Sequence, residues 1–456
     1  MPEAKSTWRF PAAFWTANVI ELFERAAYYG TFITLALFLT RTVGYGDIWA
    51  NSIAGIFAAF LYLMPFFNGA AADRLGFRRS LILAFALLAA GYATLGLFPH
   101  KVTVLFSLLL VMMGGAFVKP IITGTVAKTS DESNRARAYS LFYMMVNIGA
   151  FSGKTVAKPV RVALGLDYVP LYSAGAAVVG LILVSLFYWP KRDVVAPSEG
   201  ATQDHRGAQD ALRDLLTVLR NGRFTALILI TAAFWAIQGQ LYASMPKYVL
   251  RMVGEHASPE WYANINPAVV VLLVVPITQL VRRLEAITSI GIGLGLIPFS
   301  ALLMALSPQL STDLTLFGYQ LHPITVMMVA GIGLQGVAEC FLSPRYLEYC
   351  SRQAPPGQEG LYMGFSHVNT FFAWLFGFVL SGFLLEAYCP EPKTLSLAEQ
   401  AAWTVALKGQ GAMPEAYAHA HYIWYVFAFI GFVGFAALLV FQFVTKRADA
   451  RKRLRS

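Results

Sequence analysis

Charged residues are scarce in this sequence. Only 13% of its 456 residues are Asp, Glu, Lys or Arg, whereas soluble domains typically contain roughly 25%, and 57% are hydrophobic. This composition excludes an ordinary soluble globular protein. We therefore expect a protein that crosses the membrane many times.

Motifs for redox chemistry, metal binding and nucleotide binding are also lacking. Cys340, Cys350 and Cys389 are far apart in the sequence, which gives neither a disulfide framework nor a CxxC metal pattern. The sequence has no Gly-rich loop followed by Lys-Ser or Lys-Thr, so we expect no ATP binding or hydrolysis. We predict no enzymatic activity, no metal and no cofactor, and any uphill transport must then be driven by a gradient.

Long uncharged or nearly uncharged runs dominate the chain, and they fall into two sets. The first set lies around 12–40, 51–71, 80–98, 103–127, 138–157 and 169–189. The second set lies around 224–246, 265–281, 286–306, 323–344, 360–386 and 420–445. Such runs are typical of helices that cross the bilayer. The predicted fold class is an all-α membrane protein with 12 transmembrane helices in two six-helix halves.

One long hydrophilic stretch separates the two sets. It divides the chain into an N-terminal half (1–190), a linker (191–223) and a C-terminal half with a basic tail (224–456), and leucine spacing predicts a short amphipathic helix at 208–219. Lys and Arg concentrate on the linker side of the spans, which predicts cytoplasmic termini at the inner membrane. The net charge of +10 then fits anionic lipid, and a nucleic-acid partner is not expected.

Three charged residues lie in the middle of the first span. Each charge at the bilayer centre costs roughly 2.5 to 3.5 kcal/mol, so Glu21, Glu24 and Arg25 need partners or a water-filled cavity. Helical spacing aligns Glu21 and Arg25 with Tyr28 and Phe32 on one face. A substrate or proton pathway is the default interpretation, and a structural ion pair is the alternative.

The segment between the second and third spans carries a Gly-x-x-x-Asp-Arg-x-Gly-x-Arg-Arg pattern. Its residues include Gly69, Asp73, Arg74, Arg78 and Arg79. The pattern resembles the cytoplasmic motif of the major facilitator superfamily. Asp73 can face a helix N-terminus while the arginines bridge to carboxylates, which gives a latch that is made in one state and broken in the other. Ordinary anchoring by cytoplasmic arginines is the alternative.

Further motifs narrow the resemblance to the proton-dependent oligopeptide transporters. The first span contains Glu-x-x-Glu-Arg-x-x-Tyr-Tyr-Gly at 21–30, and the fourth contains Phe-Val-Lys-Pro at 117–120. The fifth span satisfies the family signature over 139–151. Similarity continues at Phe234–Trp235 and at 339–344. The chain is similar to a divergent member of that family.

This resemblance implies a proton-coupled symporter of peptides or small peptide-like zwitterions that works by alternating access. It implies proton coupling by Glu21, Glu24, Arg25 and Lys119. Arg25 and Lys119 would also receive the substrate carboxylate, and Glu339 would receive the amino group. The other implied pocket residues are Tyr29, Tyr62, Tyr143, Asn147 and Trp235. Structural pairing of Lys119 and Glu339, and interfacial or core packing of the tyrosines, are the alternatives.

Two positions depart from the family pattern. Phe32 stands where an arginine is usual, and Gln238 with Gly239 where an acid is usual. We expect an outer gate between Phe32 and Gly239 that closes without a salt bridge. The departure also favours one alternative, a major facilitator exporter or importer of an unrelated small molecule. A transporter-like receptor is a further alternative.

Several polar residues within the spans are added as candidates. Gln238, His367 and Asn369 are predicted to line the substrate site, with a satisfied core histidine as the alternative at His367. Lys154 is expected at the outer membrane boundary, with a pocket cation as the alternative, and Gln335 lies one turn before Glu339. We expect a monomer whose partners are the lipid bilayer, a small-molecule substrate and protons.

Overall fold

Helices make up almost all of the structure, a computed structural model that describes residues 9–64, 75–131, 134–190, 218, 220–310, 314–316, 319–353, 362 and 365–453. Contacts divide the chain into two units. The first comprises Met1–Gly44 and Phe60–Leu212, and the second comprises Tyr45–Ala59 and Arg213–Ser456. This division departs from the sequence-based halves at residues 45–59, which contact the second unit.

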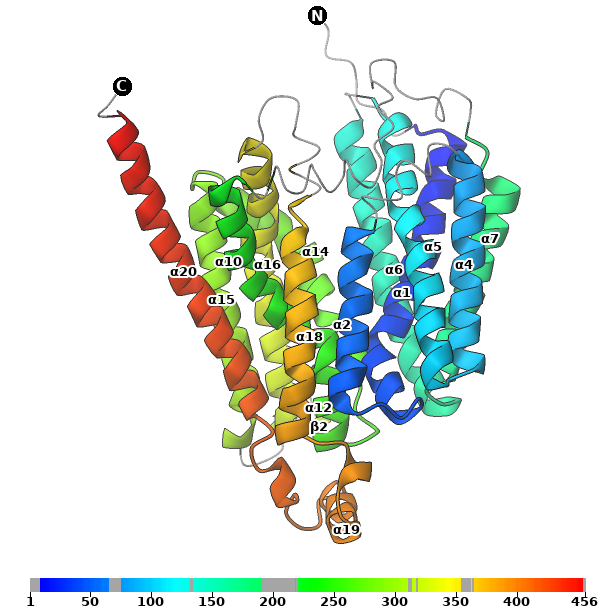
Figure 1. Cartoon of the computed structure of the whole chain (residues 1–456), viewed down its shortest axis with the longest axis vertical. Helices are drawn as coiled ribbons and strands as arrows, with labels where there is room; N and C mark the ends of the chain where they lie inside the picture. Colours follow the sequence, from blue (N-terminus) through cyan, green and yellow to red (C-terminus); the bar gives the residue numbers. More distant parts are fainter. Residues whose placement is uncertain are drawn as a thin grey trace, which may run out of the picture. The chain divides into compact units, whose positions relative to one another are not determined.

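The first unit is built from long helices. They are α1 (Ala12–Arg41), α4 (Phe77–Leu97), α5 (Lys101–Lys128), α6 (Arg135–Ala163), α7 (Tyr168–Phe187) and the end of α2 (Asp47–Leu63). Helix α1 packs against α6 and α7, and α4 packs against α5 and α7 (Figure 1). The helix that carries the intramembrane charges is thus held on two sides by its own unit.

Glycines set the distance between α1 and α6. A Cβ added to Gly153 would lie 2.2 Å from the backbone oxygen of Ala26, and one added to Gly149 would lie 2.5 Å from that of Leu22. Only glycine fits so close to a neighbouring backbone, and small residues at helix contacts are a common packing device in membranes. This packing fixes the turn of α1 that contains Arg25 against α6.

The second unit holds residues 47–59 of α2 and the later helices. They are α10 (Gly222–Gln238), α11 (Gln240–Ala243), α12 (Met245–Met252), α13 (Pro259–Tyr262), α14 (Ile265–Leu280), α15 (Ala286–Ala305), α16 (Pro323–Gln353), α18 (Val368–Tyr388), α19 (Leu397–Ala406) and α20 (Tyr422–Arg453). The short 3-10 helices are η1 (Ser307–Gln309), η2 (Pro392–Thr394) and η3 (Glu415–Tyr417). Strands β1 (Leu314–Leu316) and β2 (Tyr319–Leu321) pair antiparallel, with Thr315 opposite Gln320.

Nine helical segments of the described residues are long and apolar enough to cross a membrane. They are Phe77–Leu97, Lys101–Lys128, Tyr168–Phe187, Gly222–Ala243, Pro259–Leu280, Ala286–Ala305, Pro323–Gln353, Val368–Tyr388 and Glu415–Ala448. Helices α1 and α6, of 30 and 29 residues, carry charges within their length, and α2 is a shorter apolar helix of 17 residues. With these three, the predicted set of twelve is complete, and the all-α prediction is confirmed.

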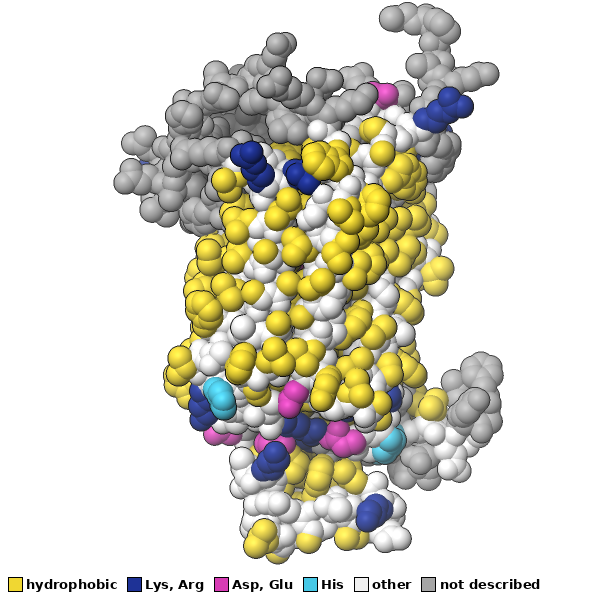
Figure 2. Space-filling model, turned by 90° about the vertical axis from the view of Figure 1, so that its right-hand side faces the viewer, with side chains coloured by type: hydrophobic (Ala, Val, Ile, Leu, Met, Phe, Trp, Pro, Cys, Tyr) yellow, Lys and Arg dark blue, Asp and Glu magenta, His cyan; other side chains and the backbone are white. Residues whose placement is uncertain are grey.

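Apolar side chains cover the outside of the helices on the face shown in Figure 2, and charged side chains gather beyond the helix ends. Exposed examples in the first unit are Val102, Phe106 and Ile182. A broad exposed apolar surface is unusual for a soluble protein and suits contact with lipid. The protein is therefore a multi-pass membrane protein.

Two predicted features fall mostly outside the described residues. The amphipathic linker helix at 208–219 is one of them, and only Val218 of that segment is described. Gly69, Asp73 and Arg74 of the predicted latch are also outside.

Candidate functional site

The predicted charged face of α1 exists in the structure. Arg25 donates from Nη2 to Oε1 of Glu24 at 2.8 Å and from Nε to the other oxygen of Glu24, and its Nε lies 3.4 Å from Oε1 of Glu21. Both glutamates are buried, whereas the Arg25 side chain keeps 17% of its surface exposed. Oε2 of Glu21 has no hydrogen-bond partner among the described residues. A buried ionised oxygen without a donor is costly, and a proton on Glu21 would lower that cost by removing the charge.

A second cation belongs to the same cluster. Lys119 of α5 is exposed, and it interacts electrostatically with Glu21, Glu24 and Arg25. Its Nζ lies 6.0 Å from the ring centroid of Tyr62. The structure therefore places Lys119 and Tyr62, two of the predicted site residues, near each other.

Lys154 of α6 is buried, with 1% of its surface exposed. Its Nζ lies 5.6 Å from the ring centroid of Tyr29, and Cζ of Arg25 lies 5.9 Å from the same centroid. The close packing of α6 on α1 therefore encloses this lysine, and its expected position at the outer membrane boundary stays a prediction. Together with Arg25 and Lys119, Lys154 is thus a third cation in this part of the first unit.

The remaining first-unit candidates are aromatic or amide side chains. Tyr28 stacks on Phe32 with a centroid distance of 5.1 Å, and Phe32 is buried. Asn147 of α6 donates from Nδ2 to the backbone oxygen of Tyr143 at 2.8 Å, and Tyr143 is 49% exposed. Tyr143 therefore presents its ring outside the packed helix contacts.

Arg25 and Lys119 balance the two glutamates when all four groups are charged, and Lys154 adds a further positive charge beside Tyr29. Arg25, Lys119 and Lys154 are the cations, and Glu21 and Glu24 are the anions. A surplus cation at low dielectric attracts an anionic ligand group such as a carboxylate.

In the second unit, Glu339 lies among neutral amides. Its Oε2 accepts hydrogen bonds from Nε2 of Gln238 at 2.5 Å and from Nδ2 of Asn266 at 3.2 Å, which join α16 to α10 and α14. Within the described part of this unit, Glu339 forms no salt bridge. Asn266 is a partner that sequence reasoning missed, although an asparagine in an apolar span is a visible signal.

Other polar atoms near these residues in sequence lack partners. Both side-chain amide atoms of Gln335 lack a hydrogen-bond partner among the described residues. The same is true of Oε1 of Gln238 and Nε1 of Trp235. Gln335 is only 1% exposed. Buried polar groups without partners are costly, and a polar ligand can supply the missing bonds.

His367 and Asn369 take different places. Asn369 is buried and donates from Nδ2 to Oγ1 of Thr231 at 3.2 Å, and its Oδ1 accepts from the backbone N–H of Thr370 at 2.6 Å. It connects α18 to α10. His367 lies just before α18 and is exposed, so its interpretation as a core histidine is wrong.

A second ionic cluster, which we call the α2–α12 cluster, consists of Asp47, Lys247, Arg251 and Glu391. Lys247 donates from Nζ to Oδ1 of Asp47 at 2.7 Å. Arg251 donates to Oδ2 of Asp47 at 2.8 Å and to Oε2 of Glu391 at 2.7 Å. Both cations have no exposed surface. Two positive and two negative charges thus pair within the protein.

Sequence analysis did not predict this cluster because its members lie at span ends, where charges are usually solvated. The available signal was the pair Lys247 and Arg251, four residues apart and therefore on one helix face. The partners Asp47 and Glu391 are distant in sequence, so no local pattern identified them.

Of the predicted latch residues, Arg78 has described contacts within the first unit. Arg78 donates from Nη2 to the backbone oxygen of Ser185 at 2.7 Å, and its Cζ lies 3.7 Å from the ring centroid of Trp189. These contacts connect α4 to the end of α7. In the described structure Arg78 therefore binds a carbonyl and an aromatic ring instead of a carboxylate.

Residues 18–319 match the family model of the Major Facilitator Superfamily. The chain belongs to this superfamily. It is 28% identical over 247 residues to dipeptide and tripeptide permease B of Salmonella typhimurium, a match that covers 53% of this chain and 48% of the permease. The chain thus spans about half the length of that relative. It is also 25% identical over 349 residues to multidrug resistance protein MdtH of Cronobacter sakazakii, covering 74% of this chain and 79% of that protein.

Structural similarity extends over the whole chain. A crystal structure of a POT family transporter in complex with a thioalcohol-conjugated peptide matches with a TM-score of 0.74 at 17% identity, covering 98% of each chain. The major facilitator fold and the resemblance to the POT family are confirmed.

Proposed function

We propose that this protein is a proton-coupled symporter of peptides or small peptide-like zwitterions. The observation that carries the proposal is the complementary charge of two clusters. With Lys154 beside Tyr29, the first unit has one more cation than anion around Arg25 and Lys119, and Glu339 has amide partners but forms no salt bridge within the described part of its own unit. A zwitterion offers a carboxylate to the first and an ammonium group to the second.

Proton coupling is assigned to Glu21, Glu24, Arg25 and Lys119. Arg25 is engaged by two carboxylates, so protonation of one of them weakens its hold on the guanidinium. The released cation is then available to a substrate carboxylate. Because the two binding events favour each other, proton and substrate binding are linked reciprocally.

The same proposal covers features that belong to the whole transport cycle. The halves 1–190 and 224–456 alternate access to the two sides of the inner membrane, and both termini lie in the cytoplasm. The chain acts as a monomer, and Phe32 and Gly239 form an outer gate without a salt bridge. Phe32→Arg and Gly239→Glu, made singly and together, test this gate, since coupling between the two changes is expected only if the positions meet.

The decisive experiment is counterflow in proteoliposomes. Vesicles preloaded with a dipeptide mixture should accumulate labelled dipeptide, and Glu339→Gln should weaken binding of the free-amine peptide far more than of its N-acetylated analogue. Equal losses for both peptides would contradict the role of Glu339. If no peptide supports exchange while the protein remains folded, the peptide assignment is wrong.

An unrelated small molecule is the second candidate substrate. The similarity to MdtH and the presence of Phe32 in place of the usual arginine favour it. A thermal-shift screen of peptides, amino acids and unrelated metabolites separates the two candidates, because a ligand at 100 times its dissociation constant adds roughly 2.7 kcal/mol of stability.

A further inference from the structure

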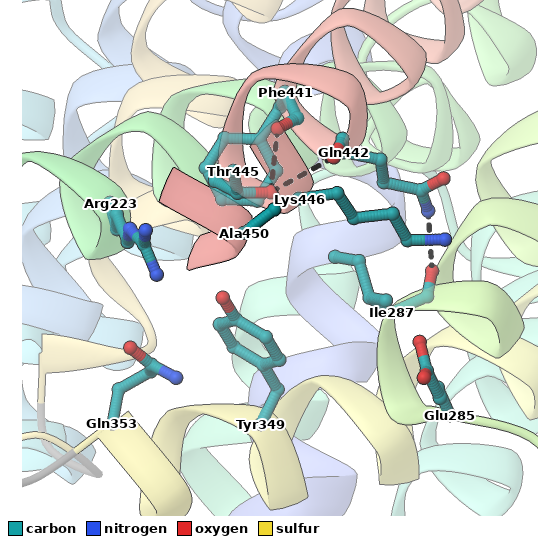
Figure 3. A pocket seen from close by; sticks show the side chains of 10 residues that line it. All are labelled: Arg223, Glu285, Ile287, Tyr349, Gln353, Phe441, Gln442, Thr445, Lys446 and Ala450. Atoms are coloured by element: carbon teal, nitrogen blue, oxygen red, sulfur yellow. Dashed lines mark hydrogen bonds between the residues drawn. The ribbon is translucent and has the colours of Figure 1, made fainter. Parts of the chain in front are cut away.

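A pocket that several polar and charged side chains line lies in the second unit, where α10 and α15 begin and where α16 and α20 end (Figure 3). Its volume is about 680 Å³. Its lining residues include neither Glu339 and its partners Gln238 and Asn266 nor any member of the α2–α12 cluster. The volume falls within the roughly 300 to 1,000 Å³ of typical small-ligand sites.

Cations from two different helices line this pocket. Arg223 comes from the first turn of α10, and Lys446 comes from α20, while Glu285 is the single acid. The lining therefore has a net charge of +1. In Figure 3 the guanidinium of Arg223, the hydroxyl of Tyr349 and the amide of Gln353 point into the same space beneath α20. Guanidinium, hydroxyl and amide groups together are typical ligands for phosphate oxygens.

The surroundings of the pocket are apolar on the outside of α20. Val440, Phe443 and Val444 are 63%, 55% and 56% exposed and lie within two turns of Lys446. A ligand at this place thus meets a polar pocket and a lipid-facing helix surface together. Basic pockets between transmembrane helices at the cytoplasmic side are suited to anionic head groups.

We propose that this pocket binds the phosphate head group of an anionic phospholipid, with its acyl chains along α20. Arg223 is the principal phosphate ligand, Tyr349 and Gln353 donate further hydrogen bonds, and Lys446 adds long-range attraction. A bound head group joins α10, α16 and α20, so the lipid should stabilise the second unit. This site is independent of the transported substrate.

Native mass spectrometry of the purified full-length protein tests the proposal with phosphatidylglycerol and phosphatidylcholine. We expect tighter retention of phosphatidylglycerol by the wild type, by about tenfold or more, and a loss of most of this preference in Arg223→Gln. Arg447→Gln is the matched control, because Arg447 is the neighbour of Lys446, carries the same charge as Arg223 and stacks over Phe443 instead of lining the pocket. The preference of Arg447→Gln for phosphatidylglycerol should stay within about twofold of that of the wild type.

Three outcomes would overturn the site. Equal retention of the two lipids would exclude head-group selection, and equal losses in Arg223→Gln and Arg447→Gln would indicate diffuse surface charge. Thermal stabilisation by millimolar inorganic phosphate, without any lipid preference, would assign the pocket to a soluble phosphate compound. If Arg223→Gln does not fold, Tyr349→Phe removes one donor with little change in shape and should still lower the lipid preference by about threefold.

Discussion

Lys247 and Asp47 form a fully enclosed ion pair, with 2.7 Å between Nζ and Oδ1. The same ammonium donates to Oδ1 of Asn51 at 2.7 Å, so α12 is bonded to two successive turns of α2. Gly382 and Gly55 bring α18 close to α2 as well, since added Cβ atoms would lie 2.7 Å from Ile48 and 2.6 Å from Phe378. Ionic and close backbone contacts thus hold residues 47–59 in the second unit.

Lys247→Met should strongly destabilise the protein. The substitution removes one of the two described charged partners of Asp47, and breaking a buried pair typically costs about 3 to 5 kcal/mol. Thermal unfolding in detergent measures the loss. Lys393→Met, which removes an exposed lysine, should leave the melting temperature nearly unchanged. A melting temperature of Lys247→Met equal to that of this control would contradict the prediction.

Cys389 should be inert to a membrane-impermeant maleimide in the wild type. Burial raises the pKa of its thiol to about 12, so near pH 8 only about one thiol in 10⁴ is ionised. The backbone oxygen of Cys389 accepts a hydrogen bond from Arg251. Arg251→Met should therefore loosen this region and increase labelling at Cys389 by at least about tenfold, as measured by peptide mapping. Fast labelling of the wild type would show that the α2–α12 cluster does not enclose this residue.

Glu21→Gln should abolish gradient-driven uptake and leave counterflow. Glutamine keeps the shape of the side chain but cannot exchange a proton, so the proton gradient can no longer drive substrate accumulation. Uptake and counterflow are compared in the same proteoliposomes with and without a pH gradient. Glu415→Gln, at an exposed site, is the control. The proposed network is misassigned if Glu21→Gln and Glu24→Gln both concentrate substrate like the wild type.

Gly153→Ala should lower stability because the new methyl group meets the backbone oxygen of Ala26 at 2.2 Å. Overpacking of this kind typically costs about 1 to 3 kcal/mol, and here it also moves α1 relative to Lys154. Gly175→Ala in α7 is the control, since nothing lies within 4 Å of its added Cβ. Thermal unfolding should rank Gly153→Ala well below Gly175→Ala, and the reverse order would exclude a tight α1–α6 contact.

The sequence by itself determined the features that depend on local helix geometry. Spacing of four residues placed Glu21 and Arg25 on one face, and the structure has them 3.4 Å apart. Uncharged runs located the spans, because a helix in lipid needs about 20 apolar residues. Both patterns are short in range, so they can be read along the chain.

Only the tertiary structure decided which distant side chains meet. Arg251 pairs with Asp47 across 204 residues, and Gln238 bonds Glu339 across 101. Lys154 resembles a boundary lysine in sequence, but packing of α6 on α1 buries it against Tyr29. Such pairings depend on which helices pack together and how closely. That is set by the summed contacts of many residues, and no single segment of the sequence encodes it.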